Sequence, residues 1–246
     1  MDEKEKRKRS QKAERKICEN LSFAAKEAFK RLRTNVLMRF PEEQKIGRVI
    51  GVTSSQPSEG KSTVALNFAY SLAELGKKVL LVDGDMRRSS IHEKLGLSKE
   101  PGLSDLMTGS TSINTTLQKY QSSKGPTSFD VIAGGTVPSN PSEILNSKRM
   151  GSFLNTLISA YDYVILDLPP IGAVTDAVAI ASQTDGMLFV MRENYCPRGL
   201  LSDCVVQLRE AKANILGFVI NGALEGSGKQ YGYSSYGSSY YSNYGS

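Results

Sequence analysis

The chain alternates short apolar runs with longer stretches in which apolar residues recur every three or four positions. The short runs are typical of buried strands, and they lie at 48–53, 78–83, 130–134, 163–168, 186–191 and 216–221. Helical spacing is found at 21–40, about 61–75, near 148–160 and near 198–212. Because short apolar strands separated by helices fill both faces of a sheet, the pattern predicts an α/β fold with a mainly parallel, doubly wound sheet flanked by helices.

The two ends of the chain differ in composition from this central part. Residues 1–16 hold eight Lys/Arg and four Asp/Glu, which accounts for most of the net charge of +6. We expect a basic flexible arm over 1–20, either solvated or bound to an anionic partner such as a membrane surface or an acidic protein. Residues 226–246 are rich in Gly, Ser and Tyr and predict a flexible tail. The length therefore predicts one domain, 21–225, between two loose ends.

Composition also excludes several classes of protein. The cysteines Cys18, Cys196 and Cys204 form no CxxC or Cys/His pattern, so we expect neither a disulfide framework nor a zinc site. No apolar run reaches the roughly 18 to 20 residues of a membrane span, and no apolar signal region follows the charged N-terminus. The sequence thus predicts a cytoplasmic protein, and no nucleic-acid partner is expected.

The loop after the first predicted strand reads SSQPSEGKST and runs into a predicted helix. This is the P-loop arrangement, in which backbone N–H groups and a helix N-terminus meet phosphate oxygens, Lys61 adds a positive charge and the Ser62 hydroxyl faces Mg²⁺. Ser55 stands where the usual motif has its first glycine, and GKST alone has an ordinary helix start as its alternative. The residues expected to bind a nucleotide are Ser58, Glu59, Gly60, Lys61, Ser62 and Thr63.

Three aspartates come at the ends of other predicted strands. Asp83 and Asp85 follow one strand, and Asp167 follows the apolar part of another. In a parallel sheet ligands bind at the carboxyl ends of the strands, so these carboxylates are expected beside the P-loop. A metal that bridges nucleotide phosphates needs only one or two carboxylates. Each aspartate alone has a turn or helix cap as its alternative, but the set beside GKST predicts a Mg²⁺-nucleotide site.

Taken in order, these motifs resemble those of the bacterial tyrosine kinases (BY-kinases), specifically the cytoplasmic kinase half of split systems for capsular or extracellular polysaccharide synthesis. SSQPSEGKST is similar to the Walker A motif of that family, VLLVDGDMRR to its Walker A′ motif and YVILDLPP to its Walker B motif. NPSEIL (140–145), TDAVAIASQTDGMLFVMR (175–192) and the C-terminal tyrosines are similar too. The resemblance covers most of residues 22–246 and implies a P-loop NTPase-like kinase fold that uses ATP and Mg²⁺.

The resemblance also implies roles for the candidate residues. Lys61 would stabilise the β- and γ-phosphates, and Asp85 would help to activate the attacking tyrosine hydroxyl. Asn221, at the end of the last strand, has two interpretations, an adenine contact and an ordinary turn residue. Which aspartate is the base is left open. The implied catalytic set is Lys61, Asp83, Asp85 and Asp167. The implied metal ligands are Ser62, Asp83 and Asp167, the last acting directly or through water.

The first predicted helix carries another feature of the family. Glu27, Lys30 and Arg33 lie on one helix face, where BY-kinases have the self-assembly motif Glu-x-x-Arg-x-x-Arg. The resemblance therefore implies a ring-like homo-oligomer. Lys30 departs from the motif, because lysine lacks the planar two-pronged contact of arginine. The alternative is a solvated face with an i,i+3 Glu/Lys pair.

The same resemblance accounts for the tail. Its tyrosines have mostly Gly and Ser around them and no apolar cluster to join, so they are displayed rather than buried. We expect them to be autophosphorylation sites that enter the active site of a neighbouring subunit. Each phosphate adds about −1.5 to −2 charges, so repulsion between tails would loosen the ring. A low-complexity segment without a specific role is the alternative. The six sites are Tyr231, Tyr233, Tyr236, Tyr240, Tyr241 and Tyr244.

The predicted function is an ATP-dependent protein-tyrosine kinase that autophosphorylates in trans and regulates capsular or extracellular polysaccharide synthesis or export. Expected partners are a transmembrane adaptor that activates the kinase and recruits it to the inner face of the cell membrane, a cognate tyrosine phosphatase and other protein substrates. One alternative is a Min/Par-like positioning ATPase, which would carry a lysine where this chain has Gln56. Another is a non-catalytic nucleotide-binding scaffold of polysaccharide assembly. A eukaryotic-type kinase is excluded, because the sequence has neither an HRD catalytic loop nor a DFG motif.

Overall fold

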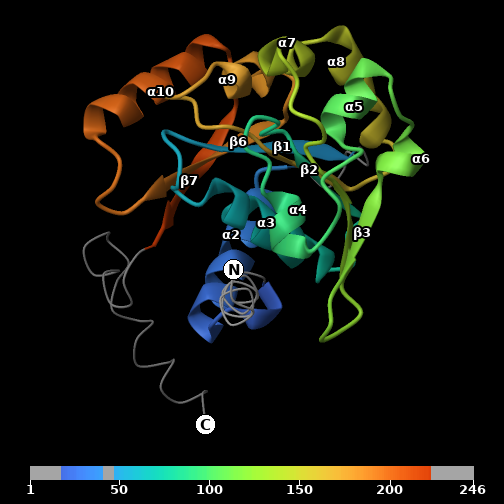
Figure 1. Cartoon of the computed structure of the whole chain (residues 1–246). Coiled ribbons are helices and arrows are strands. Elements are labelled where there is room, and N and C mark those ends of the chain that lie inside the picture. Colours follow the sequence, from blue (N-terminus) through green and yellow to red (C-terminus); the bar gives the residue numbers. More distant parts are fainter. Residues whose placement is uncertain (1–17, 41–46, 223–246) are drawn as a thin grey trace, which may run out of the picture.

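The computed structural model describes residues 18–40 and 47–222. The tail predicted over 226–246 lies outside the described residues, together with its six predicted phosphorylation sites and nearly all of the basic arm predicted over 1–20. The described part of the predicted domain folds as helices around a central sheet (Figure 1).

The described residues contain a seven-stranded sheet in the order β3-β4-β2-β5-β1-β6-β7 (Figure 1). Neighbouring strands are parallel except β3 and β4, which pair antiparallel at one edge. The predicted mainly parallel sheet is therefore confirmed. The strands are β1 (Arg48–Ser54), β2 (Val79–Asp83), β3 (Gln118–Gln121), β4 (Ser128–Ile132), β5 (Tyr163–Asp167), β6 (Gly186–Arg192) and β7 (Ile215–Asn221).

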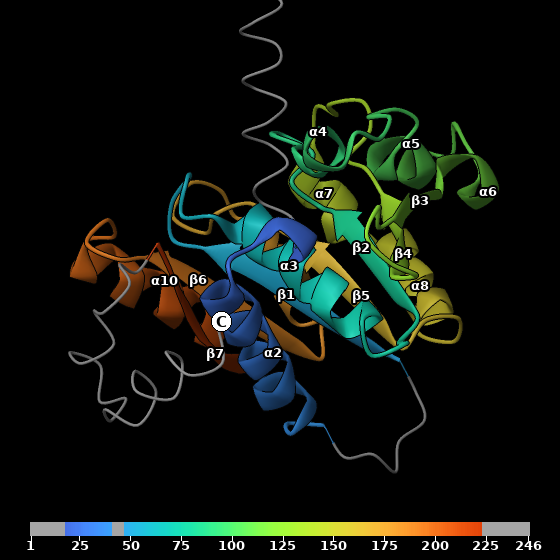
Figure 2. The ribbon, with the colours of Figure 1, turned by 90° about the horizontal axis from the view of Figure 1, so that it is seen from below.

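Helices cover both faces of the sheet, as the doubly wound prediction requires. In Figure 1, α5 and α7 to α10 lie above the sheet and α2 and α3 lie below it. Figure 2 shows α2 and α3 packed side by side on the lower face. No helix in the described part is long and apolar enough to cross a membrane. The helices are η1 (Cys18–Asn20, a 3-10 turn), α2 (Phe23–Leu37), α3 (Lys61–Ala73), α4 (Ile91–Leu95), α5 (Leu103–Thr108), α6 (Ile113–Thr116), α7 (Pro141–Leu145), α8 (Lys148–Leu157), α9 (Asp176–Ala181) and α10 (Arg198–Glu210).

Alternate side chains of the central strands supply two hydrophobic cores. In β2, Leu80 and Val82 belong to the core beneath α7 to α10, whereas Val79 and Leu81 belong to the core beneath α2 and α3. Every residue of β2 is buried. A strand buried on both faces is apolar without alternation, so continuous apolar runs in the sequence mark these strands.

The strand order brings three loops to one edge of the sheet. β5 lies between β1 and β2, and all three strands are parallel, so their carboxyl ends meet at the same edge. The connection from β1 through α3 to β2 passes over β5, which creates the kind of switch point where open α/β sheets bind ligands. The β2–β5 register places Asp83 directly opposite Asp167. The order and direction of the strands therefore place Asp83, Asp167 and the loop after β1 at the same edge of the sheet.

Candidate active site

The loop between β1 and α3 is held in shape by a carboxylate of its own. Glu59 is fully buried, and its Oε2 accepts hydrogen bonds from the backbone N–H groups of Ser55 (2.8 Å) and Gln56 (2.9 Å) and from the Ser55 hydroxyl (2.8 Å). Hydrogen bonds to an ionised acceptor are roughly twice as strong as neutral ones. Glu59, predicted among the nucleotide-binding residues, thus turns its side chain into the loop and does not line the cavity described below.

Gly60 occupies a position that excludes other residues. It precedes α3 in the left-handed conformation (φ 94°), which favours glycine, and a Cβ there would lie 2.0 Å from Nδ2 of Asn221. That amide donates a hydrogen bond to the carbonyl of Glu59 at 2.9 Å. Asn221 therefore fastens the end of β7 to the P-loop, and its contact with adenine stays a prediction.

Lys61, the first residue of α3, faces two carboxylates, one at the end of β5 and one in the loop after β2. Its Nζ lies 2.8 Å from Asp85 Oδ2 and 3.4 Å from Asp167 Oδ1, and it donates to the Ser62 hydroxyl at 3.3 Å. Burial opposes the charge of the ammonium, but the negative charges of Asp167 and Asp85 outweigh burial and raise the pKa of Lys61. The predicted lysine and two of the three predicted aspartates therefore meet at one point.

Asp83 ends β2 and is fully buried. Its Oδ2 accepts hydrogen bonds from the Ser89 hydroxyl (2.8 Å) and from the backbone N–H groups of Ser90 (2.9 Å) and Ile91 (3.0 Å), just before and at the start of α4. Burial, followed by the nearby charge of Asp167, raises the pKa of Asp83 to about 7. The three hydrogen bonds thus fix the Asp83 carboxylate in position. Its negative charge is not fully neutralised by the positive groups nearby.

The residues present fit a Mg²⁺ ion that arrives with phosphate. Asp83 Oδ1 and Asp167 Oδ2 are both buried without a hydrogen-bond partner, and burial also raises the pKa of Asp167 against the opposing charge of Lys61. The Ser62 hydroxyl, the third predicted ligand, hydrogen-bonds Asp167. Mg²⁺ takes one or two carboxylates together with phosphate oxygens and water. Among the described residues, no cluster of three or more His, Cys, Asp or Glu side chains could hold a metal unaided.

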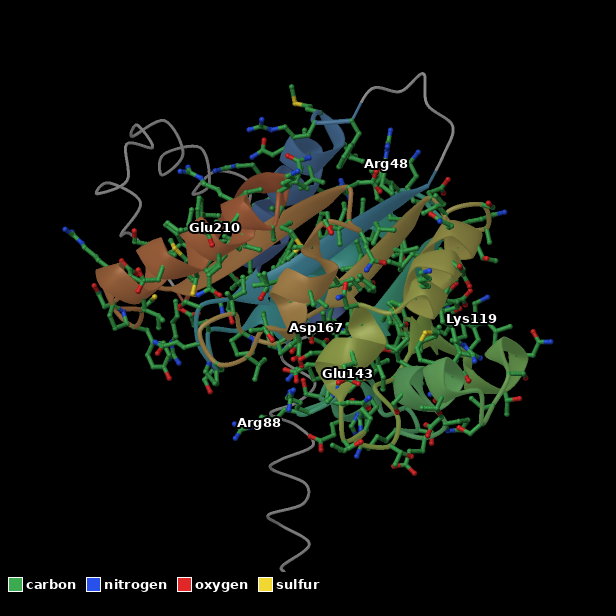
Figure 3. All side chains as sticks on the ribbon, turned by 90° about the horizontal axis from the view of Figure 1, so that it is seen from above. Arg48, Arg88, Lys119, Glu143, Asp167 and Glu210 are labelled. Atoms are coloured by element: carbon green, nitrogen blue, oxygen red, sulfur yellow. The ribbon has the colours of Figure 1, made fainter. Side chains whose placement is uncertain are left out.

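A cavity of about 670 Å³ lies against this cluster. Asp85 lines it, whereas Asp83 and Asp167 are fully buried and do not. Figure 3 shows Asp167 at the same end of the sheet as Arg88, which points outward. A second cavity of about 620 Å³, beside β2 and β4, contains none of the predicted site residues. The predicted nucleotide-binding residues that line the first cavity are Ser58, Gly60, Lys61, Ser62 and Thr63.

An ion pair on the cavity wall was not predicted from the motifs. Arg87 lines the cavity, and its Nε and Nη2 donate to the two carboxylate oxygens of Asp176 at 2.9 and 3.2 Å. Asp176, the first residue of α9, is buried and also accepts a hydrogen bond from the hydroxyl of Ser142 in α7. Ser142 and Asp176 belong to the NPSEIL and TDAVAIA segments, which resemble the family's sequences and had no role assigned to them. The structure links both segments to the cavity wall.

The three residues predicted for self-assembly do not act together within this chain. Glu27 and Lys30 pair with each other at 2.7 Å on the exposed side of α2. Arg33 instead turns towards α3, where its Nη1 donates to the carbonyl of Ser71. The Glu27–Lys30 pair is the contact expected of a solvated face, and an oligomeric role for these residues stays a prediction.

Comparisons with known proteins agree with this geometry. A family profile described as an AAA domain matches residues 47–216. EpsB of Ralstonia nicotianae is 36% identical over 220 residues, which cover 89% of this chain but only 28% of the length of EpsB. Tyrosine-protein kinase YwqD of Bacillus subtilis is 33% identical over 207 residues, which cover 84% of this chain and 85% of YwqD.

A solved structure extends the similarity to three dimensions. The kinase domain of the Escherichia coli tyrosine kinase ETK matches with a TM-score of 0.74 and 34% identity, over 80% of this chain and 75% of that one. The resemblance inferred from the motifs is therefore confirmed by sequence and by fold. The chain, with an AAA domain over most of its length, belongs to the family of bacterial tyrosine-protein kinases.

Proposed function

We propose that this chain is an ATP-dependent protein-tyrosine kinase that phosphorylates its C-terminal tyrosine cluster in trans and so regulates capsular or extracellular polysaccharide synthesis or export. The observation that carries the proposal is the meeting of Lys61 with Asp85 and Asp167 against a P-loop cavity. The cavity of about 670 Å³ is of the size that binds small ligands and cofactors. Family membership makes a tyrosine hydroxyl the first acceptor to test.

The P-loop would hold the nucleotide by its backbone and by one charge. Backbone N–H groups at the start of α3 point at the phosphates, and the ammonium of Lys61 meets the β- and γ-phosphate oxygens. When Lys61 turns to phosphate, the aspartates that it faces lose their counter-charge. Ser62, Asp83 and Asp167 would hold Mg²⁺, which when bound would supply positive charge to those carboxylates and to the phosphates.

Asp85 is placed to take the proton. Of the three aspartates it alone lines the cavity, where an acceptor hydroxyl can reach it. In the transfer, the tyrosine oxygen forms a bond to the γ-phosphorus, the bond from that phosphorus to the β–γ bridging oxygen breaks, and ADP leaves. The hydroxyl proton passes to Asp85. We therefore assign the base to Asp85 and the metal to Asp83 and Asp167.

The proposed partners are other copies of this chain, a membrane adaptor, a phosphatase and further substrates. A ring held through Glu27, Lys30 and Arg33 would bring the tail of one subunit to the cavity of the next. A transmembrane adaptor would activate the kinase and hold it at the inner face of the cell membrane. A cognate tyrosine phosphatase would reverse the modification, and other proteins would be further substrates.

Gln56 argues against a positioning ATPase. Such enzymes carry a lysine at this position, whereas here a neutral amide donates a hydrogen bond to the carbonyl of Tyr195 at 2.9 Å. The side chain at this point of the P-loop is thus engaged by the β6–α10 loop of its own chain. The absence of a lysine at this position favours a kinase over the ATPase alternative.

Purified protein incubated with Mg·ATP tests the proposal directly. Mass spectrometry should find phosphotyrosine in the tail of protein produced in a host without other tyrosine kinases. Lys61→Met should abolish it, and Lys77→Met, which removes an exposed lysine outside the cavity, should not. Phosphotyrosine on the Lys61→Met protein would refute the site. ATP hydrolysis without phosphotyrosine would indicate the positioning ATPase, and neither activity would indicate the scaffold.

A further inference from the structure

Positive charge dominates the wall of the candidate active-site cavity. Five Lys and Arg side chains line it, and Asp85 is the one carboxylate among its lining residues. Two of the five are neutralised within the chain, since Lys61 pairs with Asp85 and Asp167 and Arg87 pairs with Asp176. The five cations are Lys61, Arg87, Arg88, Lys94 and Arg192.

Arg88 is the cation of this wall whose backbone is tied to the proposed base. Its backbone N–H donates to the Asp85 carboxylate at 3.0 Å and to the Asp85 carbonyl at 3.1 Å. Its side chain is exposed, points outward at the end of the sheet that carries Asp167 (Figure 3), and enters no ion pair among residues 18–40 and 47–222. The backbone of Arg88 is therefore fixed beside Asp85, and from there its exposed side chain can reach an anion at the cavity wall.

The acceptor segment carries no acidic residue of its own. Residues 226–246 contain no Asp or Glu, so an anion in this segment comes from phosphorylation of its side chains. Successive tyrosines of the cluster are one to four residues apart. An extended chain advances about 3.3–3.6 Å per residue, so a phosphotyrosine two to four residues from the acceptor lies roughly 7–14 Å from it. A phosphate on such a neighbouring tyrosine would therefore lie beside, rather than at, the point of transfer.

We propose that Arg88 binds a phosphotyrosine already present in the acceptor segment while a nearby tyrosine of the same segment reaches Asp85. This inference rests on the proposed kinase function. It adds an order of phosphorylation among the tyrosines of the segment, because each transfer creates a phosphotyrosine that favours transfer to a nearby tyrosine. Guanidinium and phosphate form two parallel hydrogen bonds, a geometry that lysine does not reproduce. Since Arg88 is exposed, we expect a preference of roughly fivefold, and we expect it to shrink as salt is added.

Two synthetic peptides of residues 236–246 test the proposal on the full-length chain. Both carry Tyr236→Phe and Tyr240→Phe, so that Tyr244 is the only acceptor. Residue 241 is phosphotyrosine in one peptide and phenylalanine in the other. The ratio of their kcat/KM values should be roughly five for the unchanged enzyme and close to one for Arg88→Ala. Arg88→Lys should give an intermediate ratio, and Arg209→Ala, which removes an exposed arginine from the last turn of α10, should keep it.

Fluorescence anisotropy of the same peptides measures binding without chemistry, and it should show the same preference for the phosphorylated peptide and the same loss in Arg88→Ala. Equal use of both peptides by the unchanged enzyme would overturn the inference and leave the kinase proposal standing. A ratio that survives in Arg88→Ala would overturn the assignment to Arg88. An equal rise in the KM for ATP with both peptides in that variant, without a change in their ratio, would assign Arg88 to the nucleotide instead. If neither peptide is phosphorylated, the kinase proposal and this inference fail together.

Discussion

Replacing Glu59 by glutamine tests whether the negative charge of this buried side chain holds the P-loop in its conformation. Glu59 Oε2 accepts three hydrogen bonds of 2.8, 2.8 and 2.9 Å from Ser55 and Gln56. Glutamine keeps an acceptor oxygen and nearly the same volume but loses the negative charge. A hydrogen bond to a charged group contributes about 1.5–3 kcal/mol and a neutral one about 0.5–1.5 kcal/mol, so roughly 1 kcal/mol is lost per bond. A neutral amide costs less to bury than a carboxylate, which leaves a net loss of about 2 kcal/mol.

Native-state hydrogen exchange measures this loss where it occurs. The amide protons of Ser55 and Gln56 are themselves donors to Glu59. A loop that opens about 2 kcal/mol more easily exposes them roughly 30-fold more often. The matched control is Glu210→Gln, because Glu210 is exposed at the end of α10 (Figure 3). The amide of Leu81, in the buried strand β2, should exchange at an unchanged rate in both variants.

Two results would refute the reasoning. Unchanged exchange at Ser55 and Gln56 in Glu59→Gln would show that the charge of the carboxylate does not hold the loop. Equal acceleration at Leu81 would show that the substitution weakens the whole domain rather than the loop. The measurement uses the protein without nucleotide, so neither outcome depends on the proposed activity.

Three further predictions concern the aspartates and the oligomer. Asp83→Ala should weaken Mg·ATP binding in calorimetry, whereas Asp85→Ala should lower phosphotyrosine formation more than nucleotide affinity; equal loss of affinity would contradict the division of roles. Because the pKa of Asp83 is raised to about 7 from a usual value of about 4, the folded state binds more protons than the unfolded state between these values. Without divalent cations, the free energy of unfolding should therefore fall as pH rises from about 4 to about 7. Asp83→Asn should flatten that slope in urea titrations, and an unchanged slope would contradict the assignment. Light scattering should show a large assembly for the inactive Lys61→Met protein and for the control Lys61→Met/Lys77→Ala, but monomers for Lys61→Met/Arg33→Ala; an unchanged assembly in Lys61→Met/Arg33→Ala would contradict the proposed interface.

The central strands could be predicted because they are buried on both faces. The run at 78–83 became β2 (Val79–Asp83), with every residue buried. β3 (Gln118–Gln121) could not be predicted in this way, because at the antiparallel edge of the sheet only Tyr120 of its residues is buried. Helices α4 to α7 and α9 are shorter than two turns, too short for a helical period to show in the sequence.

The cluster of Lys61, Asp85 and Asp167 could be predicted from the topology. The carboxyl ends of parallel strands lie at the same edge of the sheet, whatever path the connections between them take. The inward turn of Glu59 could not, because it depends on which way a side chain points within the loop. The Arg87–Asp176 pair joins residues 89 positions apart, so no local pattern marks it. The sequence therefore located Lys61 and the aspartates around it, whereas the inward turn of Glu59 and the Arg87–Asp176 pair depended on tertiary packing.

The in-register pairing of β2 with β5 has a consequence for how this protein can be changed. Asp83 and Asp167 are carried by hydrogen-bonded neighbouring strands, so their separation follows from the strand spacing of about 4.8 Å and from no loop. The cation Arg88 and the apolar wall residues Pro169 and Val174 stand on connections beyond the strand ends. Those connections can be redesigned for a new acceptor while the sheet keeps the acidic pair at its original separation.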